Sequence, residues 1–296
     1  MTAPSPISRV ERDVDLATRS TYGLRARAGA LVTLRSRRDL EDLETQLRSL
    51  APDWRVLGAG SNVILGEGCR NLTLLSLEGD WDSLEVDESG RARLGAGISL
   101  PVAARRLSAA GWSGFEWAVG IPGRAGGAAV MNAGGHGADL ARVVRRVEVW
   151  RDGEVTWWEK ESLDLRYRHS SLGENDLVLS VEVQLEPGDP DESAARLRDI
   201  VRWRREHQPG GRNAGSVFTN PVGDHAARLL EAAGVKGVRR GGAEVSSKHA
   251  NFILCDPGTD AREVIDLMVF MRERVLETHG VALTTEHRFL GVEAPW

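Results

Sequence analysis

The chain has 296 residues, enough for two or three lobes with cores of their own. Its apolar content of 41% and charged content of 27% are typical of globular proteins, and a net charge of −5 gives no electrostatic case for nucleic acid as the main partner. No run of about eighteen apolar residues predicts a membrane span, and the first residues lack the apolar run of a signal peptide. Cys69 and Cys255 belong to no CxxC pattern, so we expect reduced thiols in a cytoplasmic protein with no membrane partner.

The N-terminal part of the sequence predicts a poorly ordered arm over residues 1–20. Apolar patterns then predict a strand at 30–35, a helix over 37–50, and strands at 54–57 and 63–66. The last two strands flank a glycine loop, LGAGSN at 57–62. A Rossmann loop would need a third glycine and a following helix, whereas strand-like residues follow Gly58 and Gly60. We therefore interpret this loop as a nest of backbone amides that can hold a pyrophosphate.

Further along the chain, short strands and turns are expected from 72 to 97. Asp152-Gly153 between two β-rich runs is a strong hairpin signal. Asp260, with Glu263 three residues later, predicts a capping box for the last helix, and Gly280 ends that helix. The expected helices are 100–110, 197–206, 224–233 and 262–279, the expected strands are 143–151, 155–158, 177–185 and 251–254, and a boundary is expected at 187–190.

The segment 114–139 contains eight glycines in 26 residues. Each glycine inside a helix costs roughly 0.5–1 kcal/mol relative to alanine, so this composition argues against a core helix. It is typical of backbone that approaches a large ligand and offers its N–H groups. A glycine-rich buried turn is the alternative interpretation. The second glycine loop upstream favours one long ligand held at two places.

Six segments carry a resemblance to a known family: LGAGSN at 57–62, GIPGRAGGAAVMNAGG at 120–135, RYRHSSL at 166–172, AGSVFTNP at 214–221, GGAEVSSKHANFI at 241–253 and TEHRFLG at 285–291. In this order they resemble the UDP-N-acetylenolpyruvoylglucosamine reductase (MurB) family. The resemblance runs from Thr21 to Gly291. It is closer to the family's shorter, type II form, because no long insertion separates Arg168 from the C-terminal part.

The resemblance implies an α+β protein with a two-lobed FAD-binding fold of the vanillyl-alcohol-oxidase type and a C-terminal substrate-binding domain. The expected parts are the arm at 1–20, FAD lobes at 21–78 and 79–190, and the substrate domain at 191–296. The implied cofactor is non-covalent FAD with NADPH as the reductant, and the implied reaction reduces the enolpyruvyl ether of UDP-N-acetylglucosamine to UDP-N-acetylmuramate. A monomer is expected. The seven histidines show no metal-ligand spacing, and this reaction needs no metal.

Reduction of an enolpyruvyl group creates an enolate, which needs a stabilising cation or hydrogen bonds and a proton donor. Arg168 offers a guanidinium for the carboxylate; the alternative is a surface arginine between strands. Glu286 matches the family's second enolate-stabilising residue; the alternative is a solvated carboxylate. Ser216 matches its proton donor; the alternative is a serine at a strand edge.

The resemblance also places ligand-binding residues along the chain. His136 lies near the flavin segment, but nothing in the sequence assigns it a covalent flavin bond. The residues expected to bind FAD are Gly58, Ala59, Gly60, Ser61, Asn62, Gly120, Ile121, Pro122, Gly123, Gly126, Gly127, Asn132, Ala133 and Gly134, and those expected to bind the UDP-sugar are Asn220, Lys236, Lys248 and His249.

Three positions depart from the family pattern. Thr219 stands where lysine is usual, so one phosphate contact is in doubt. His287 stands where valine is usual, which puts the proton affinity of Glu286 in doubt. Residues 25–27, Arg-Ala-Arg, replace a pair of glycines near the expected adenine site.

Two other functions remain open on the sequence. One is another FAD-dependent oxidoreductase of this fold acting on a sugar or alcohol, and the other is a non-catalytic nucleotide-binding module. Stimulation of NADPH oxidation by the enolpyruvyl nucleotide separates the first from the reductase, and a yellow protein that NADPH bleaches excludes the second.

Overall fold

The computed structural model describes residues 9–50 and 53–296, which form two compact units. The first unit contains residues 9–11, 30–59 and 73–204 of the described chain, and the second contains 12–29, 60–72 and 205–296. Three of the unit boundaries fall inside elements, namely strands β1 (Arg9–Asp15) and β2 (Arg27–Leu34) and helix α4 (Pro190–His207). The division of the chain into an arm, two FAD lobes and a substrate domain, with boundaries at 20, 78 and 190, stays a prediction. The two compact units divide the chain at other positions.

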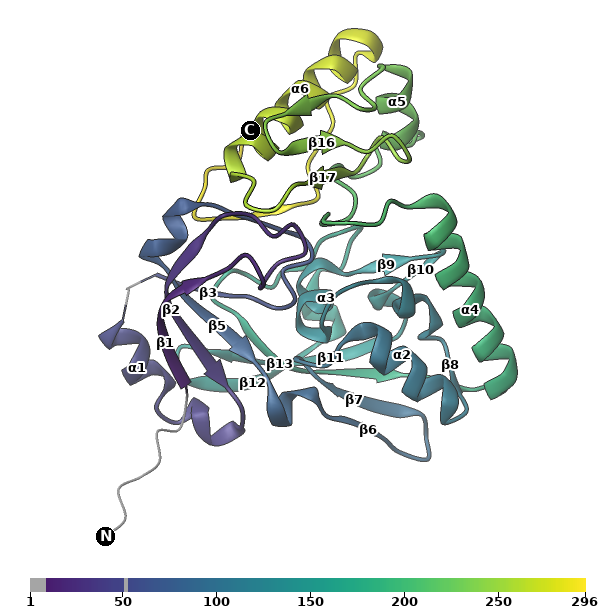
Figure 1. Ribbon diagram of the computed structural model, residues 1–296. Coiled ribbons are helices and arrows are strands. Elements are labelled where there is room, and N and C mark those ends of the chain that lie inside the picture. The colour runs from purple at the N-terminus through teal and green to yellow at the C-terminus, as the bar shows by residue number, and fades with distance from the viewer. Residues whose placement is uncertain (1–8, 51–52) are drawn as a thin grey trace. The chain divides into compact units, whose positions relative to one another are not determined.

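The main sheet of the first unit is antiparallel, in the order β12-β11-β13-β7-β6 (Figure 1). The predicted hairpin is confirmed: Asp152 has φ +50° and Gly153 has φ +85°, the two positive angles that a tight primed turn requires. The strands are β6 (Leu84–Val86), β7 (Arg91–Gly95), β11 (Val144–Arg151), β12 (Glu154–Glu159) and β13 (Leu177–Gln184).

A second sheet has the order β1-β2-β5-β3, in which β2 and β3 (Trp54–Val56) run parallel to the fully buried β5 (Thr73–Leu77). The prediction of a disordered arm is wrong for residues 9–15, which form β1, and Leu16 after them is buried. Residues 1–8 of that prediction lie outside the described residues. Val32 and Leu75 of this sheet belong to the same hydrophobic core as Val147 and Val181 of the main sheet.

The single helix expected over 37–50 is instead a 3-10 turn (Arg37–Leu40) followed by helix α1 (Leu43–Ser49). The carboxylate of Asp39 accepts hydrogen bonds from the backbone N–H of Arg35 (2.6 Å) and Ser36 (2.9 Å). These bonds close a separate turn before the helix begins.

The glycine-rich segment includes helix α3 (Ala125–Met131), which corrects the expectation that no helix forms there. The reason is close packing. A Cβ on Gly126 would lie 3.0 Å from Cβ of Ala96, so the glycine lets the helix approach the main sheet. Figure 1 shows α3 against β13.

Two longer helices complete the first unit: α2 (Leu100–Ala109), as predicted, and α4 (Pro190–His207). Helix α4 begins seven residues before the predicted start. Pro190 occupies its first position, and the Asp189 carboxylate accepts from the N–H of Asp191 at 2.7 Å, so the expected boundary is a helix start. Short pairs are β8 (Trp112–Ser113) with β14 (Glu186–Pro187) and β9 (Gly134–Gly135) with β10 (Ala138–Asp139).

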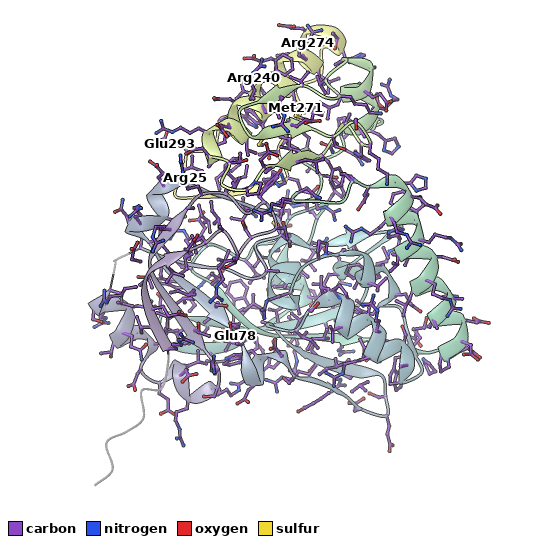
Figure 2. The ribbon with its side chains drawn as sticks, in the orientation of Figure 1. Arg25, Glu78, Arg240, Met271, Arg274 and Glu293 are labelled. Carbon is purple, nitrogen blue, oxygen red and sulfur yellow. The ribbon has the colours of Figure 1, made fainter. Side chains whose placement is uncertain are left out.

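The second unit contains a three-stranded sheet with helix α6 against it, and helix α5 packs against α6 (Figure 1). On α6 the side chain of Met271 is fully buried, while Arg274 lies at the surface (Figure 2). The elements are α5 (Ala226–Ala232), α6 (Ala261–His279), β15 (Arg239–Arg240), β16 (Ala243–Val245) and β17 (Ile253–Cys255).

The core of the second unit draws on three separate parts of the sequence. Tyr22 and Ile64 are fully buried in one cluster with α6 residues such as Leu267. In addition, β4 (Val63–Leu65) pairs in parallel with β18 (Arg288–Leu290). In the described part of the chain no helix is long and apolar enough to cross a membrane.

The capping box of α6 is confirmed, and its contribution can be measured. Asp260 accepts from the N–H of Arg262 at 2.9 Å and also pairs with Arg25 at 3.0 Å. Asp260→Ala should lower the free energy of unfolding by about 1 kcal/mol in urea titrations. Asp260→Asn keeps the acceptor and loses only an exposed ion pair, so it should cost less than about 0.5 kcal/mol. Equal losses in the two variants would assign the stabilisation to the ion pair.

Candidate active site

Arg168 lies at the tip of a tight turn in the first unit. Arg166 and His169 exchange two backbone hydrogen bonds, of 3.1 and 3.0 Å, which leave Tyr167 and Arg168 as the turn residues. Arg168 has φ +56°, a conformation that costs a non-glycine residue on the order of 1 kcal/mol. Its Nη2 donates to the carbonyl of Gly134 at 2.8 Å. The surrounding structure therefore holds the Arg168 backbone in an unfavourable conformation, and the Gly134 carbonyl fixes its guanidinium.

The same turn is hydrogen-bonded to the end of α3. Asn132 is buried, adopts φ +39° and ends the helix. Its Nδ2 donates to the carbonyl of Arg166 (2.9 Å), and its Oδ1 accepts from the N–H of Ala141 (2.9 Å). The Ser170 hydroxyl donates to the carbonyl of Val130 at 2.8 Å. The structure thus brings Arg168 together with Asn132, Ala133 and Gly134, three residues predicted to line the flavin.

Gly134 begins a small hairpin whose turn residues, His136 and Gly137, have φ +53° and +80°. A Cβ on Gly134 would lie 2.5 Å from Cβ of Asp139, so a side chain is excluded there. The His136 ring meets the Trp203 ring edge-on with centroids 5.1 Å apart, and burial lowers the pKa of His136. Helix α4 also holds Gly120, whose carbonyl accepts from the Arg204 guanidinium.

Arg124 is a residue that the sequence analysis missed. Its Nη1 donates to the carbonyls of Gly97 (2.7 Å) and Leu77 (3.1 Å), directly before α3 begins. It therefore ties the start of α3, inside the predicted flavin segment, to the end of β5 and to the backbone just after β7. A signal was present, because Arg124 is the only arginine or lysine between 114 and 139.

The glycines of the two loops fall into two groups. Among the described residues, apart from the adjoining chain, no atom lies within 4 Å of where a Cβ of Gly58 or Gly127 would be, and both residues are exposed. Gly60 has φ +60°, and its Cβ would lie 2.3 Å from the carbonyl oxygen of Arg19. Gly126 and Gly60 thus serve packing, whereas Gly58 and Gly127 leave open backbone that a ligand can approach. As predicted, a strand and not a helix follows the first loop.

Asn62 uses its side chain inside the second unit. Its Nδ2 donates to the carbonyl of Glu286 at 2.9 Å, and its Oδ1 lies 2.9 Å from Nδ1 of His287. The N–H of Arg288 donates to the Asn62 carbonyl at 3.0 Å, where β18 begins beside β4. Asn62 and Glu286 are therefore hydrogen-bonded to each other, and the Asn62 side chain is held by the second unit.

Ser216 and Glu286 lie on adjacent backbone segments of the second unit. The N–H of Glu286 donates to the carbonyl of Val217, the residue after Ser216, at 2.9 Å. The buried Asn251 side chain holds the Ser216 segment, because its Oδ1 accepts from the Phe218 N–H (2.9 Å) and its Nδ2 donates to the Phe218 carbonyl (2.8 Å). Both Ser216 and Glu286 are half-buried. Asn251 was missed, and its only sequence signal is a polar residue between apolar ones.

The four residues predicted to bind the substrate each have a partner within the second unit. Oδ1 of Asn220 accepts from the N–H of Ala226 (3.1 Å) at the start of α5, Nζ of Lys236 pairs with Glu231 (2.6 Å), and Nζ of Lys248 donates to the carbonyl of Arg205 (2.6 Å). Burial lowers the pKa of His249, and the charge of Lys236 adds to this effect, so these two lie in one electrostatic environment. These contacts do not assign a ligand to any of the four residues.

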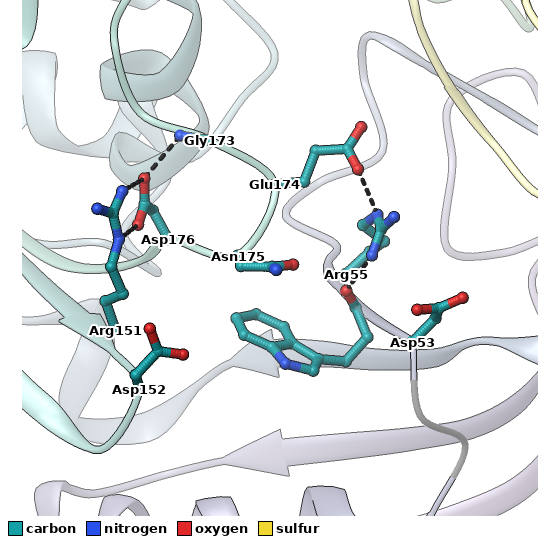
Figure 3. Close-up of a pocket in the computed structure, with 9 residues that line it drawn as sticks. Asp53, Arg55, Arg151, Asp152, Gly173, Glu174, Asn175 and Asp176 are labelled. Carbon is teal, nitrogen blue, oxygen red and sulfur yellow. Dashed lines mark hydrogen bonds and ion pairs between the residues drawn. The ribbon is translucent and has the colours of Figure 1, made fainter.

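A depression of about 520 Å³ in the first unit contains none of the predicted site residues (Figure 3). Two ion pairs line it: Arg151 with Asp176 at 2.6 Å, and Arg55 with Glu174 at 2.8 Å. Because its arginines are already paired, we assign it no function. In the described residues no group of three or more His, Cys, Asp or Glu side chains could hold a metal ion.

Comparison with known proteins decides the family. The UDP-N-acetylenolpyruvoylglucosamine reductase C-terminal domain matches residues 206–290, and an FAD binding domain matches 28–158. The chain is 39% identical to UDP-N-acetylenolpyruvoylglucosamine reductase 2 of Symbiobacterium thermophilum, over 97% of this chain and 94% of the relative. It is 33% identical to the Bacillus subtilis reductase, over 96% and 95%. The chain belongs to the UDP-N-acetylenolpyruvoylglucosamine reductase family.

A solved structure agrees with this reductase family. The crystal structure of the Thermus caldophilus UDP-N-acetylenolpyruvylglucosamine reductase (MurB) superposes with a TM-score of 0.82 at 33% identity, covering 95% of this chain and 99% of that one. The predicted family, the α+β FAD-binding fold, the FAD cofactor and the oxidoreductase class are therefore confirmed. The roles of individual site residues stay predictions.

The departure from the reductase pattern at His287 has a structural explanation. Its ring is buried, and Nε2 lies 3.0 Å from the hydroxyl of Tyr22. Burial lowers the pKa of His287 to about 4. Tyr22 and Asn62 thus supply the polar partners that a valine would not need.

This burial should make stability depend on pH. Between pH 6.5 and 4 the unfolded chain binds a proton at His287 and the folded protein does not, so the free energy of unfolding falls as pH falls through this window. The loss should be about 3 kcal/mol, at about 1.4 kcal/mol per pH unit. His287→Val should remove that part of the slope in urea titrations from pH 7.5 to 4.5.

A fully exposed, non-titrating side chain of the same unit supplies the control. Val222→Ala should leave the pH slope as it is in the unmodified protein. Identical slopes in the unmodified protein and the His287→Val variant would contradict the buried neutral state of this ring.

Proposed function

We propose that the protein reduces UDP-N-acetyl-enolpyruvoylglucosamine to UDP-N-acetylmuramate with NADPH as the reductant, as a cytoplasmic monomer supplying peptidoglycan precursors. The observation that carries the proposal is the backbone hydrogen bond from Glu286 to Val217, which places Ser216 and Glu286 on neighbouring segments. This pairing lies within the region that matches the reductase C-terminal domain.

The residues present fit FAD. Exposed Gly58 and Gly127 leave open backbone at both predicted loops, as a long ligand held at two places requires. The backbone N–H groups of Gly58 to Asn62 would hold the pyrophosphate, and 120–127 with Asn132 to Gly134 would line the ring and the ribityl chain. Bound there, FAD would supply the hydride transfer from NADPH to the methylene carbon of the substrate.

In this proposal Arg168 binds the substrate carboxylate and stabilises the enolate that follows hydride addition. Its fixed position supports this role. The guanidinium is anchored by Gly134 and its backbone is held in a costly conformation, so little reorganisation is needed when charge develops. Strained backbone of this kind is common at functional sites.

Glu286 stabilises the same enolate, and Ser216 donates the proton to the carbon that bears the carboxylate. A serine hydroxyl is a weak acid, so this step requires a strongly basic carbanion at hydrogen-bond distance. The positive φ of Gly215 (+83°) and the Asn251 side chain set the backbone on both sides of Ser216. Asn220, Lys236, Lys248 and His249 would bind the UDP group.

Ser216→Ala tests the proton donor. The variant should bind FAD, and NADPH should still bleach it, because neither step uses the hydroxyl. Steady-state turnover of the enolpyruvyl nucleotide should fall by about 10²–10⁴-fold. Ser247→Ala, at an exposed serine of the same unit, should keep normal turnover. Near-normal turnover in Ser216→Ala would remove this residue from the mechanism.

Arg168→Lys tests whether the reaction needs the planar pair of N–H donors of the guanidinium. Lysine keeps the charge but loses the planar pair of donors, so turnover should fall at least about tenfold while flavin reduction by NADPH is unaffected. Arg166→Lys is the matched control in the same turn, where the side chain pairs with Asp164 at 2.7 Å. Equal effects of the two substitutions would indicate that the turn, and not the Arg168 guanidinium, matters.

A further inference from the structure

The side chains of Tyr22, His287 and Asn62 form a hydrogen-bonded chain in the second unit that ends at Glu286. Tyr22 and His287 are buried, and the distances along the chain are 3.0 Å from Tyr22 to His287, 2.9 Å from His287 to Asn62 and 2.9 Å from Asn62 to the Glu286 carbonyl. The Glu286 N–H continues the chain to the carbonyl beside Ser216, at Val217 (2.9 Å).

All the hydrogen bonds of this chain point in the same direction, from Tyr22 toward Val217. Nδ1 of His287 faces the Asn62 oxygen, which can only accept, so Nδ1 carries the proton. Nε2 is then the acceptor, and the Tyr22 hydroxyl donates to it. Bonds polarised in one direction strengthen one another, and the Asn62 oxygen sets the tautomer of the ring.

This order decides which way the Asn62 amide faces. The two ends of a carboxamide have nearly the same shape, so packing alone does not distinguish them. The Glu286 carbonyl can only accept, so it requires Nδ2 on its side, and Oδ1 then faces the Nδ1–H of His287, which gives that oxygen its partner. In the reversed amide, the Asn62 oxygen would face the Glu286 carbonyl oxygen, and two acceptors would be opposed. Both backbone polar groups of Glu286 are therefore bonded, the carbonyl to Asn62 and the N–H to Val217.

We propose that His287 is a positioning residue: through Asn62 it holds Glu286 beside Ser216 in the geometry that enolate protonation requires. This inference rests on the proposed function. It also explains how a histidine can occupy a position where valine is usual in the resemblance, since Tyr22 and Asn62 satisfy both ring nitrogens.

A double-mutant cycle separates positioning from stability. The variants are His287→Val, Tyr22→Phe and the two combined, each loaded with FAD. Three quantities are measured: the melting temperature, the rate of flavin reduction by NADPH, and the rate at which the enolpyruvyl nucleotide reoxidises the reduced enzyme. Affinity for FAD should change less than threefold, because backbone bonds from Thr21 to Gly60 (3.1 Å) and from Arg288 to Asn62 (3.0 Å) hold the loop.

His287→Val should slow reoxidation by the nucleotide at least tenfold and leave flavin reduction within twofold of the unmodified enzyme. The double variant leaves no buried hydroxyl facing valine, so its melting temperature should exceed that of His287→Val alone. Reoxidation should stay slow in the double variant. Recovery of reoxidation in step with the melting temperature, or an unchanged rate in His287→Val, would overturn the positioning role.

A measurement on the unmodified protein covers the case in which the variants fold poorly. Nitrogen-15 NMR of histidine-labelled protein should show His287 neutral at pH 7 with the proton on Nδ1, and an Nε2–H ring would overturn the inference. Failure of the enolpyruvyl nucleotide to reoxidise the unmodified enzyme after NADPH has reduced it is a different result. It would overturn the proposed function, and the positioning role with it.

Discussion

The backbone of residues 284–290 is hydrogen-bonded on two sides, and the second unit depends on this arrangement. On one side β18 runs parallel to β4, with Phe289 opposite Ile64. On the other, the N–H of Thr219 donates to the carbonyl of Thr284 and the N–H of Glu286 to that of Val217, both at 2.9 Å. Three distant parts of the sequence therefore meet along one short strand. Without it, the glycine loop and the Ser216 segment would have no common support.

Asparagine side chains perform the same task in both units. Asn132 joins the end of α3 to the Arg168 turn, Asn251 holds the Ser216 segment, and Asn62 holds Glu286. An asparagine side chain both donates and accepts, so it can satisfy irregular backbone that no sheet or helix pairs. Loops that carry chemistry have such backbone, and a buried amide left without a partner costs about 1–3 kcal/mol. The candidate site is thus positioned mainly by side-chain bonds to backbone.

The elements that the sequence predicted well carry their signal locally. Helix α6 has its capping box and terminal glycine, and the β11–β12 hairpin has its Asp-Gly turn. The elements it missed depend on distant partners. Three-residue β18 exists because of β4, more than 200 positions earlier, and α3 forms despite its glycines because Gly126 packs against Ala96. Local propensity contains neither contact.

The residues of the candidate site show the same contrast between local sequence signals and distant partners. Arg168, Ser216 and Glu286 were named because short motifs around them are recognisable, and their chemistry is readable from the residue type. Arg124, Asn251 and Tyr22 were not, because each acts on backbone or a ring that the sequence does not place nearby. Of these, Arg124 carries the clearest sequence signal, an isolated charge in a glycine-rich segment.

The pair Tyr22 and His287 shows why single departures from a family pattern are hard to interpret alone. A histidine in a buried position must find partners for two ring nitrogens, or the site loses stability. Here the phenol and the Asn62 amide are both in place, so the polar substitution is tolerated without any charge being buried at neutral pH. Asn62 has a second partner in Glu286 and cannot easily change, which leaves Tyr22 as the position that must change together with 287. The aromatic hydroxyl at 22 and the imidazole at 287 are therefore one structural unit, and neither has a physical explanation without the other.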